Sequence, residues 1–329
     1  MKIRVLSADD VRRALPMREA IEGMKQAYAQ LSTGRADVPL RGRVSIAPEA
    51  ATTLVMPAYL QESEALAVKV VSVFPQNADK LEPVIYGAVL VLEANSGRPL
   101  AVLNGGVLTA IRTGAGSGAA TDILANPDAE VVAILGSGVQ ARTQLEAVCT
   151  VRNIKEVRVY SPNHDHAVIF AREMKNHDPI PGLIRIMSNP ETAVRGADII
   201  CAATTSSTPV FNGRDIKAGA HINGVGSFTA QMQEVDAETV RKAYVVVDNR
   251  EAALDEAGDL IIPIQQGIIR EGHIAAELGE IITHMKYGRT DDEQITFFKS
   301  VGNAAQDAIA AQIVLKNAEK MNLGTLAEF

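Results

Sequence analysis

The chain has 329 residues, of which 47% are hydrophobic, 22% charged and 4% aromatic. This length exceeds what one core usually serves, so two domains are expected. The 32 Lys and Arg residues against 39 Asp and Glu residues give a formal charge of −7, which argues against nucleic acid and membrane surfaces as partners. Two cysteines are too few for a disulfide framework, and no apolar run approaches the about 20 residues of a membrane span, so we expect a cytoplasmic protein.

The first third of the sequence predicts helix, then sheet, then helix. Apolar residues recur at helical spacing over 11–31, with Ser7 suited to cap the start and Gly34 the end. Short β-rich runs fill 43–103 between turn residues, which is typical of an antiparallel meander. Residues 108–124 follow as a helix whose Gly and Ala content allows another backbone to approach closely.

After Pro127 the pattern changes to continuous apolar runs that alternate with helical segments. Strands buried on both faces have this pattern, and the alternation indicates a Rossmann-type, doubly wound parallel sheet. The fold class is therefore α/β, with this sheet in a domain at 121–304. An α+β domain at 1–120 accompanies it, and the C-terminal helix at 305–329 completes that first domain.

A phosphate-binding turn is predicted at the start of the second domain. The apolar strand 131–135 runs directly into Gly136-Ser137-Gly138-Val139-Gln140-Ala141, and a helical segment follows. Gly136 allows a tight turn, Gly138 allows the backbone to approach a pyrophosphate, and Ala141 allows close packing of helix and strand. The free N–H groups at the helix N-terminus would then face the phosphate charge.

The residue that reads the ribose decides between the two nicotinamide cofactors. An Asp or Glu normally stands about 20 residues after the glycines and binds the ribose hydroxyls of NAD. Ser161 takes that place here, and Asn163 follows. Both side chains can hydrogen-bond a 2′-phosphate, so we favour NADP, although Ser-Pro-Asn is also an ordinary turn that accepts NAD.

Basic residues in apolar settings are the candidates for binding an anion. Lys69 lies within an apolar strand, where a buried ammonium needs an anionic partner unless the strand is a solvent-facing edge. Arg112 has no acid three or four residues away, and its guanidinium suits a carboxylate or a phosphate. Arg43 is a weaker candidate, because Arg41 beside it makes a solvated basic turn equally plausible.

Hydrolase and metal chemistry find no support in the sequence. It contains neither a Gly-x-Ser-x-Gly nor a His-Glu-x-x-His pattern. Cys149 lacks an obvious base, and His221, which begins a strand, is expected to fill a structural hydrogen bond. No metal site is predicted.

Over almost the whole chain, the sequence resembles the ornithine cyclodeaminase/mu-crystallin family. Seven landmarks in family order carry the resemblance and are far more specific than one glycine motif. They are Met56-Pro57-Ala58, the Lys69 strand, Ser96-Gly97-Arg98-Pro99-Leu100-Ala101, Leu108-Thr109-Ala110-Ile111-Arg112-Thr113-Gly114-Ala115, Gly136-Ser137-Gly138-Val139-Gln140, His221-Ile222-Asn223-Gly224-Val225-Gly226 and Ser300-Val301-Gly302.

The resemblance implies a homodimer whose first domain binds substrate and supplies the dimer sheet, while the second binds a nicotinamide cofactor. It also implies that Arg43, Lys69 and Arg112 hold the carboxylate of a small imino or amino acid. The cofactor contacts that it implies are Gly136, Gly138, Val139, Gln140, Ser161, Asn223, Val225, Ser300 and Val301.

Two departures discriminate within the family. Members that cyclise ornithine carry one acid two residues before the Met-Pro pair and another just after the Gly-rich strand end. Leu54 and Phe228 occupy these places here. A second substrate ammonium would lose its partners, so ornithine is disfavoured, and Glu234 or Asp236 would restore it only through an altered loop.

We therefore expect an NAD(P)H-dependent oxidoreductase that reduces a small α-imino acid, with Δ1-pyrroline-2-carboxylate, which gives L-proline, as the leading candidate. Arg112 and Arg43 would fix the carboxylate, and Lys69 would pair with it or transfer the imine proton. Three alternatives stay open: alanine dehydrogenase-like reductive amination, ornithine cyclodeamination with recycled NAD, and a mu-crystallin-like binding protein without catalysis.

Overall fold

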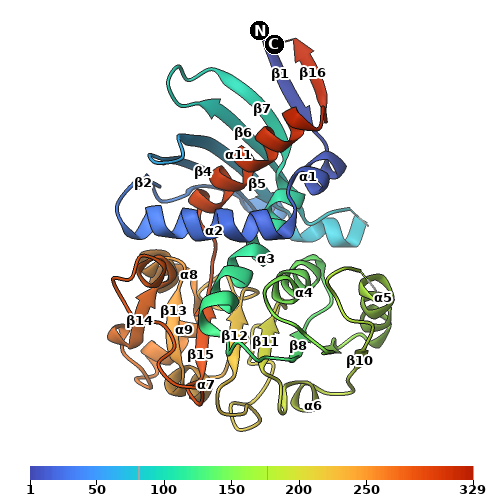
Figure 1. Ribbon diagram of the computed structural model, residues 1–329, viewed down its shortest axis with the longest axis vertical. Coiled ribbons are helices and arrows are strands. Elements are labelled where there is room, and N and C mark those ends of the chain that lie inside the picture. Colours follow the sequence, from blue (N-terminus) through green and yellow to red (C-terminus); the bar gives the residue numbers. More distant parts are fainter. Residues whose placement is uncertain (81, 176, 329) are drawn as a thin grey trace. The chain divides into compact units, whose positions relative to one another are not determined.

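The computed structural model describes residues 1–80, 82–175 and 177–328 (Figure 1). Within these residues, no helix combines the length and apolar character needed to cross a membrane. The same residues contain no group of three His, Cys, Asp or Glu side chains placed to hold a metal ion.

The chain divides into two compact units, each with its own sheet. The first unit consists of 1–112 together with 303–329, and the second is the continuous segment 113–302. One change of unit falls inside the long helix α3 (Gly105–Leu124). The sequence had placed this boundary at residue 120.

The first unit is built on the predicted antiparallel meander. Its central strands are β4 (Ala51–Leu60), β5 (Ala65–Val73), β6 (Ile85–Glu93) and β7 (Pro99–Asn104), each antiparallel to the next. The other elements are β1 (Lys2–Leu6), α1 (Ala8–Ala14), α2 (Met17–Ser32), β2 (Ala36–Asp37), β3 (Gly42–Ile46), the 3-10 helices Ala47–Glu49 and Pro75–Lys80, α11 (Ala304–Lys320) and β16 (Thr325–Glu328).

The sheet of the first unit also brings together strands from both ends of the described chain. β1 pairs with β7 in parallel and with β16 antiparallel, and the full order is β16-β1-β7-β6-β5-β4-β2, with β3 on β4 (Figure 1). Neither β1 nor β16 was predicted from the sequence. The C-terminal segment thus contributes both a helix and a strand to this unit.

The period of two in β5 places Lys69 in the core. Ala65, Ala67 and Lys69 are buried, while Val70 is 41% exposed, so alternate residues point to opposite faces of the sheet. β5 lies between β4 and β6, and α11 packs on β4 and β5. The solvent-facing edge-strand interpretation of Lys69 is therefore wrong.

The N-terminal helical region is broken in two by a proline. Ser7 caps α1 in a capping box with Asp10, as the sequence suggested. Leu15, the C-cap of α1, leaves helical geometry, and Pro16 is the N-cap of α2. A residue before proline is disfavoured in the α-helical region, which explains why one predicted helix became two.

The second unit has a parallel sheet in the order β10-β9-β8-β11-β12-β15-β13-β14, which confirms the Rossmann-type prediction. Its other elements are helices between the strands. The bounds are β8 (Val131–Leu135), α4 (Val139–Val151), β9 (Glu156–Tyr160), α5 (His164–Met174), β10 (Ile184–Ile186), α6 (Pro190–Val194), β11 (Ile199–Ala202), β12 (His221–Gly224), α7 (Ala237–Lys242), β13 (Tyr244–Val247), α8 (Arg250–Glu256), α9 (Gly258–Gln265), the 3-10 helix Glu271–His273, β14 (Ile274–Glu277), α10 (Leu278–Ile282) and β15 (Thr296–Lys299).

The small residues of α3 allow the close approach that their composition predicted. A Cβ atom on Gly114 would lie 2.4 Å from the carbonyl oxygen of Thr143 in α4. No side chain fits at that distance. Gly114 therefore sets the spacing between α3 and α4 inside the second unit.

Candidate active site

The glycine turn lies between β8 and α4, as predicted. Gly136 has a φ of +108°, and a Cβ there would lie 2.5 Å from the carbonyl oxygen of Ala203. Gly138 is the N-cap of α4, and a Cβ there would meet nothing within 4 Å. Because Gly138 has no side chain to cap the helix, the first N–H groups of α4 stay available to a phosphate. The residues at this turn fit a dinucleotide.

Val139 and Gln140, the other predicted contacts at this turn, form the first residues of α4. Val139 is 66% exposed, whereas Ala141 is fully buried. This arrangement places the backbone of Val139 and Gln140 at the helix start and packs Ala141 against the strand, as the motif predicts.

Arg142 braces the glycine turn and was missed by the sequence analysis. Its Nη1 donates to the carbonyl oxygens of Ser137 at 2.5 Å and Gly138 at 3.0 Å. Its Nε donates to Glu173 at 3.0 Å, and its guanidinium lies 5.5 Å from the ring centre of Phe170. Contacts with α5 thereby fix the Arg142 side chain, and Arg142 in turn stabilises the phosphate-binding turn.

The side chains at the predicted ribose position accept hydrogen bonds within the protein. Ser137 Oγ donates to Ser161 Oγ at 3.0 Å. Asn163 caps α5, and its Oδ1 accepts from the N–H groups of Asp165 at 3.0 Å and His166 at 3.3 Å. Both side chains act as acceptors in these bonds, so the Ser161 hydroxyl hydrogen and Asn163 Nδ2, the donors that a 2′-phosphate needs, are not used by them. The geometry is compatible with a phosphate contact and with an ordinary turn.

Asn223 is fully buried in β12, and both ends of its amide are used. Its Oδ1 lies 3.2 Å from His221 Nε2, and its Nδ2 donates to Thr121 Oγ1 at 3.0 Å. Burial lowers the pKa of His221 to about 3, so the imidazole is neutral and structural, as expected. Val225, the next predicted contact, is buried just after the strand.

Ser300 and Val301 follow β15, where Asp248 orders the turn. Ser300 Oγ donates to Asp248 Oδ2 at 2.7 Å, and the Gly302 N–H donates to the same oxygen at 2.8 Å. Asp248 is itself buried. The backbone of Val301 is therefore held in a fixed turn at the end of the strand.

In the first unit, the two predicted cations share one buried carboxylate. Lys69 Nζ lies 2.6 Å from Asp307 Oδ2, and Arg112 Nε lies 3.1 Å from Asp307 Oδ1. The exposed fractions are 2% for Lys69, 6% for Arg112 and 1% for Asp307. Two cations and one carboxylate leave one net positive charge in a desolvated place, which favours a further anion.

Gln306 holds the orientation of Arg112. Its Oε1 accepts from Arg112 Nη1 at 3.0 Å and from the Asn303 N–H at 3.0 Å. Its Nε2 donates to Tyr28 OH at 2.8 Å. The planar guanidinium is thus fixed from two sides, by Asp307 and by Gln306, on the same turn of α11.

The pKa of Lys69 is lowered from 10.5 to about 8. Burial is the largest cause, and the charges of Arg112 and Arg41 act in the same direction, while Asp307 raises the pKa. An ammonium with such a pKa gives up its proton far more readily than a solvated lysine. Lys69 is therefore suited both to pair with an anion and to transfer a proton.

Arg43 lies on β3, exposed and opposite Leu54 of β4. Arg41, two residues earlier, is the arginine whose charge acts on Lys69. The sequence alone predicts Arg41 only as a solvated neighbour of Arg43. Its charge brings Arg41, more directly than Arg43, into the electrostatic surroundings of the cluster.

The two positions that discriminate within the resembled family carry no charge. Leu54 is half-buried in β4, and Phe228 is 46% exposed. Glu234 is fully buried and accepts N–H donors from Thr204, Gly226 and Ser227. Asp236 caps α7. Neither acid is free to bind a distal ammonium.

In the first unit, sequence reasoning missed the site residues Asp307 and Gln306, yet Asp307 left a signal. It lies in the Ala-rich segment Ala304–Ala311, without a Lys or Arg three or four residues away. An acid in such a setting needs a distant partner, by the same argument that was applied to Lys69 and Arg112. Gln306 left no comparable signal, because a neutral amide carries no charge to balance.

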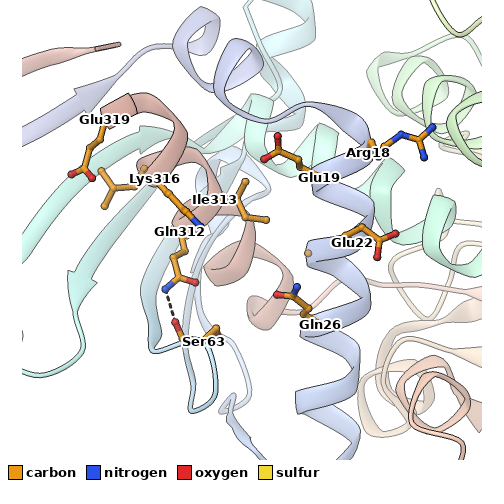
Figure 2. Close-up of a pocket in the computed structure, with 11 residues that line it drawn as sticks. Arg18, Glu19, Glu22, Gln26, Ser63, Gln312, Ile313, Lys316 and Glu319 are labelled. Atoms are coloured by element: carbon orange, nitrogen blue, oxygen red, sulfur yellow. Dashed lines mark hydrogen bonds between the residues drawn. The ribbon is translucent and has the colours of Figure 1, made fainter. Parts of the chain in front are cut away.

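A groove on the first unit is separate from these residues. It has a volume of about 670 Å³ and is lined by residues of α2 and α11 together with Ser63. Figure 2 shows Arg18 and Glu22 on α2, and Lys316 and Glu319 on α11. Charges of both signs alternate around it, so the groove favours no single ionic ligand.

The model of the ornithine cyclodeaminase/mu-crystallin family matches residues 1–322. The chain belongs to this family. A Delta(1)-pyrroline-2-carboxylate reductase of Bacillus cereus is 42% identical over 326 residues, which is 99% of both chains. The family resemblance inferred from the sequence is thus confirmed.

Two solved structures of family relatives share the fold. Delta(1)-pyrroline-2-carboxylate reductase of Thermococcus litoralis, in complex with NADH and L-proline, has a TM-score of 0.94 and 44% identity, over 98% of this chain and 99% of that one. An archaeal alanine dehydrogenase dimer with bound NAD has a TM-score of 0.92 and 31% identity over 100% of both chains.

Proposed function

We propose that this family member is an NAD(P)H-dependent reductase that converts Δ1-pyrroline-2-carboxylate to L-proline. The observation that carries the proposal is full-length identity of 42% to a reductase with that substrate in its name. A second support is the relative solved with NADH and L-proline, which has a TM-score of 0.94. The buried cluster of Lys69, Arg112 and Asp307 supplies a physical reason, because its net positive charge matches one substrate carboxylate.

Arg112 and Lys69 are proposed to bind that carboxylate. Arg112 is already oriented by Asp307 and Gln306, so little side-chain freedom is lost when the anion binds. Two arginines lie just before β4. The charge of Arg41 lowers the pKa of Lys69, which supports Arg41 as a further ligand of the carboxylate. Arg43 is kept as the candidate that the family resemblance implies. Fixing the carboxylate fixes which face of the C=N bond is attacked.

Lys69 is the proposed proton donor. Reduction of the imine adds a hydride to the carbon and a proton to the nitrogen, and an ammonium with a pKa of about 8 carries that proton at neutral pH. NAD(P)H, when bound, supplies the hydride. Gly136, Gly138 and the first N–H groups of α4 would hold the pyrophosphate, with Ser300 and Val301 as further contacts.

The choice between NADP and NAD belongs to the proposal as well. The absence of a carboxylate at Ser161 removes the repulsion that would exclude a 2′-phosphate, which favours NADP. Ser161 Oγ and Asn163 Oδ1 are acceptors within the protein, which leaves their donor groups for a 2′-phosphate, whereas the relatives solved with cofactor contain NADH or NAD. We therefore propose that the protein accepts NADPH and also uses NADH.

A homodimer is proposed through the sheet of the first unit. On the face opposite Lys69, Val55 and Val70 are cross-strand partners that are 38% and 41% exposed. Adjacent exposed valines in central strands are typical of an interface, and the related alanine dehydrogenase is a dimer. A cytoplasmic location stays a prediction from composition.

Reductive amination of a 2-oxo acid is the second candidate, supported by the alanine dehydrogenase relative with 31% identity. Ornithine cyclodeamination lacks its two acids, since Leu54 and Phe228 stand in their places. A protein that only binds a neutral ligand would leave the buried positive charge of the Lys69 cluster without an anionic partner, which is costly.

A substrate panel tests the proposal. Purified protein is assayed for NADPH and NADH oxidation with Δ1-pyrroline-2-carboxylate, with its six-membered homologue, and with pyruvate plus ammonia. We expect the five-membered imine to give the highest kcat/KM, and Lys69→Met to abolish its reduction while NADH binding is retained. A higher kcat/KM for pyruvate plus ammonia establishes the second candidate, and ammonia release from ornithine without net oxidation establishes cyclodeamination.

A further inference from the structure

A second buried ionic network lies in the Rossmann unit, apart from the Lys69 cluster. Lys299, Asp259 and Glu234 are all 0% exposed. Lys299 Nζ lies 2.9 Å from Asp259 Oδ2 and donates to the carbonyl oxygen of Ser227 at 2.5 Å. Asp259 Oδ1 in turn accepts from the N–H groups of Glu234 at 2.7 Å and Val235 at 3.0 Å.

Glu234 joins the segments that follow two neighbouring strands. Its Oε1 accepts from the N–H of Thr204, after β11, at 2.5 Å. Its Oε2 accepts from the N–H groups of Gly226 at 2.6 Å and Ser227 at 3.0 Å, after β12. The N–H groups of these two segments lie beyond the ends of the strands, and the Glu234 carboxylate accepts their hydrogen bonds in place of a neighbouring strand.

The backbone around this carboxylate is closely packed. A Cβ on Gly226 would lie 2.1 Å from the carbonyl oxygen of Thr204 and 2.5 Å from Glu234 Oε1. A Cβ on Gly258, beside Asp259, would lie 2.0 Å from the carbonyl oxygen of Met232. The loop from β12 to α7 is therefore clamped at its start by Glu234 and at its end by Asp259.

The network lies at the carboxyl ends of the parallel strands, where dinucleotides bind in this fold. β11, β12 and β15 are parallel neighbours, and Thr204, Gly226 and Lys299 lie at their carboxyl ends. Open α/β sheets bind their ligands outside the carboxyl ends of the strands. Burying three charges is costly and adds little net stability, so a purely structural network is a poor explanation of their presence at this edge.

We propose that Lys299, Asp259 and Glu234 act as positioning residues that hold the loops after β11 and β12 in the cofactor-binding conformation before the cofactor arrives. The inference rests on the proposed NAD(P)H-dependent reduction. All three side chains are fully buried within the protein. They act through the backbone of Thr204, Gly226 and Ser227.

Glu234→Gln is the decisive variant, because it keeps the shape and changes the hydrogen-bonding sense of one atom. The new NH2 group would face either Thr204 N–H or the pair Gly226 and Ser227, so a donor would meet a donor. We expect the dissociation constant for NADH, measured by fluorescence titration, to rise about tenfold. Single-turnover imine reduction at saturating NADH should also slow by about tenfold.

Asp198→Asn is the matched control, because Asp198 lies at the opposite, amino ends of the strands of the same sheet. Asp198 also accepts two backbone N–H groups, from Glu130 at 2.9 Å and Val131 at 2.8 Å, and forms an ion pair with Lys217. We expect this variant to lower the melting temperature and leave NADH binding and single turnover within about twofold of the wild type. A Glu234→Gln protein that also stays within that range on both measurements overturns the proposal.

Hydrogen exchange of the wild-type protein gives a test that needs no variant to fold. The amides of Thr204, Gly226 and Ser227 should be protected without NADH. Exchange at unprotected rates that slows only when NADH is added shows that the cofactor orders the loops, and overturns the proposal. NADH binding is read here without an imine, so a failure of Δ1-pyrroline-2-carboxylate to react refutes the proposed substrate and leaves this test intact.

Discussion

At the scale of single residues, one carboxylate in the first unit pairs with two buried cations. Lys69 and Arg112 both pair with Asp307, and each was recognised in the sequence as a charge that needs a partner. Asp307 carries the same kind of signal, but its pairing with these two cations could not be found that way, because the pairing depends on which helix covers β5. Sequence spacing reports faces of one element and carries no information on which elements pack together.

Asp307→Asn should shift the pH dependence of catalysis. Asp307 raises the pKa of Lys69, which lies at about 8 in its presence, so its removal lowers that pKa further. In the proposed mechanism, imine reduction needs the protonated ammonium of Lys69, so kcat/KM falls as pH rises through its pKa. The fall should therefore begin at lower pH in the variant, as measured by pH profiles of imine reduction.

The exposed ion pair between Asp9 and Arg13 supplies the control. Asp9→Asn should leave the pH profile unchanged. Identical profiles for the wild type and Asp307→Asn would mean that Lys69 does not donate the proton.

Ser161→Asp should restore the usual discrimination against NADPH. A carboxylate at this position accepts from the ribose hydroxyls of NADH and repels the 2′-phosphate of NADPH. We expect the ratio of kcat/KM for NADPH to that for NADH to fall by about tenfold or more. Gln61→Glu adds the same charge at an exposed position of the first unit and should leave the ratio unchanged. An unaltered ratio in Ser161→Asp places the ribose elsewhere.

At the scale of elements, strands with strong hydrophobic patterns were predicted, and strands whose pattern includes a charged residue over a short length were missed. β4 to β7 alternate or run apolar over six or more residues, and β8, β9 and β11 to β13 are apolar runs beside turn residues. β10, β14 and β15 have three or four residues each and contain Arg185, Glu277 and Lys299, respectively. The equally short β11, β12 and β13 contain no Asp, Glu, Lys or Arg. β15 also ends at Lys299, whose charge conceals a strand that is buried along its whole length.

Gly114→Ala tests the contact between α3 and α4. The added methyl group would meet the carbonyl of Thr143 at 2.4 Å, and a backbone atom cannot move aside as a flexible side chain does. Although alanine favours helix by itself, we expect a net loss of about 2 kcal/mol in unfolding free energy from overpacking. Urea denaturation measures it, with Gly272→Ala, which meets nothing within 4 Å, as the control. A stabilised Gly114→Ala protein would refute the close contact.

At the scale of the whole molecule, the family landmarks were spread over both units, which is why function could be predicted further than single motifs allow. The assignment of substrate residues to the first unit and cofactor residues to the second came from that resemblance. Physical reasoning from the residues reached the phosphate turn, Lys69 and Arg112. It did not reach Gln306, Asp307 or Arg142, because each acts through contacts with other elements.

Val70→Asp should dissociate the proposed dimer. Val70 is 41% exposed in β5, and a charge buried at an interface without a partner strongly opposes association. In analytical ultracentrifugation, the wild type should sediment at twice the chain mass of 35.0 kDa, and the variant at that mass. Val168→Asp, at a 42% exposed position on α5, should stay dimeric. A dimeric Val70→Asp protein moves the interface away from this sheet face.

The first unit is interrupted in the chain by the second, and this has a consequence for biosynthesis. Lys69 is translated long before Asp307, and all of residues 113–302 emerge between them. The Rossmann unit is continuous and can fold as it leaves the ribosome. The sheet that bears Lys69 must wait for α11, so the nascent chain carries an unneutralised lysine and an uncovered sheet face until the last helix has been made.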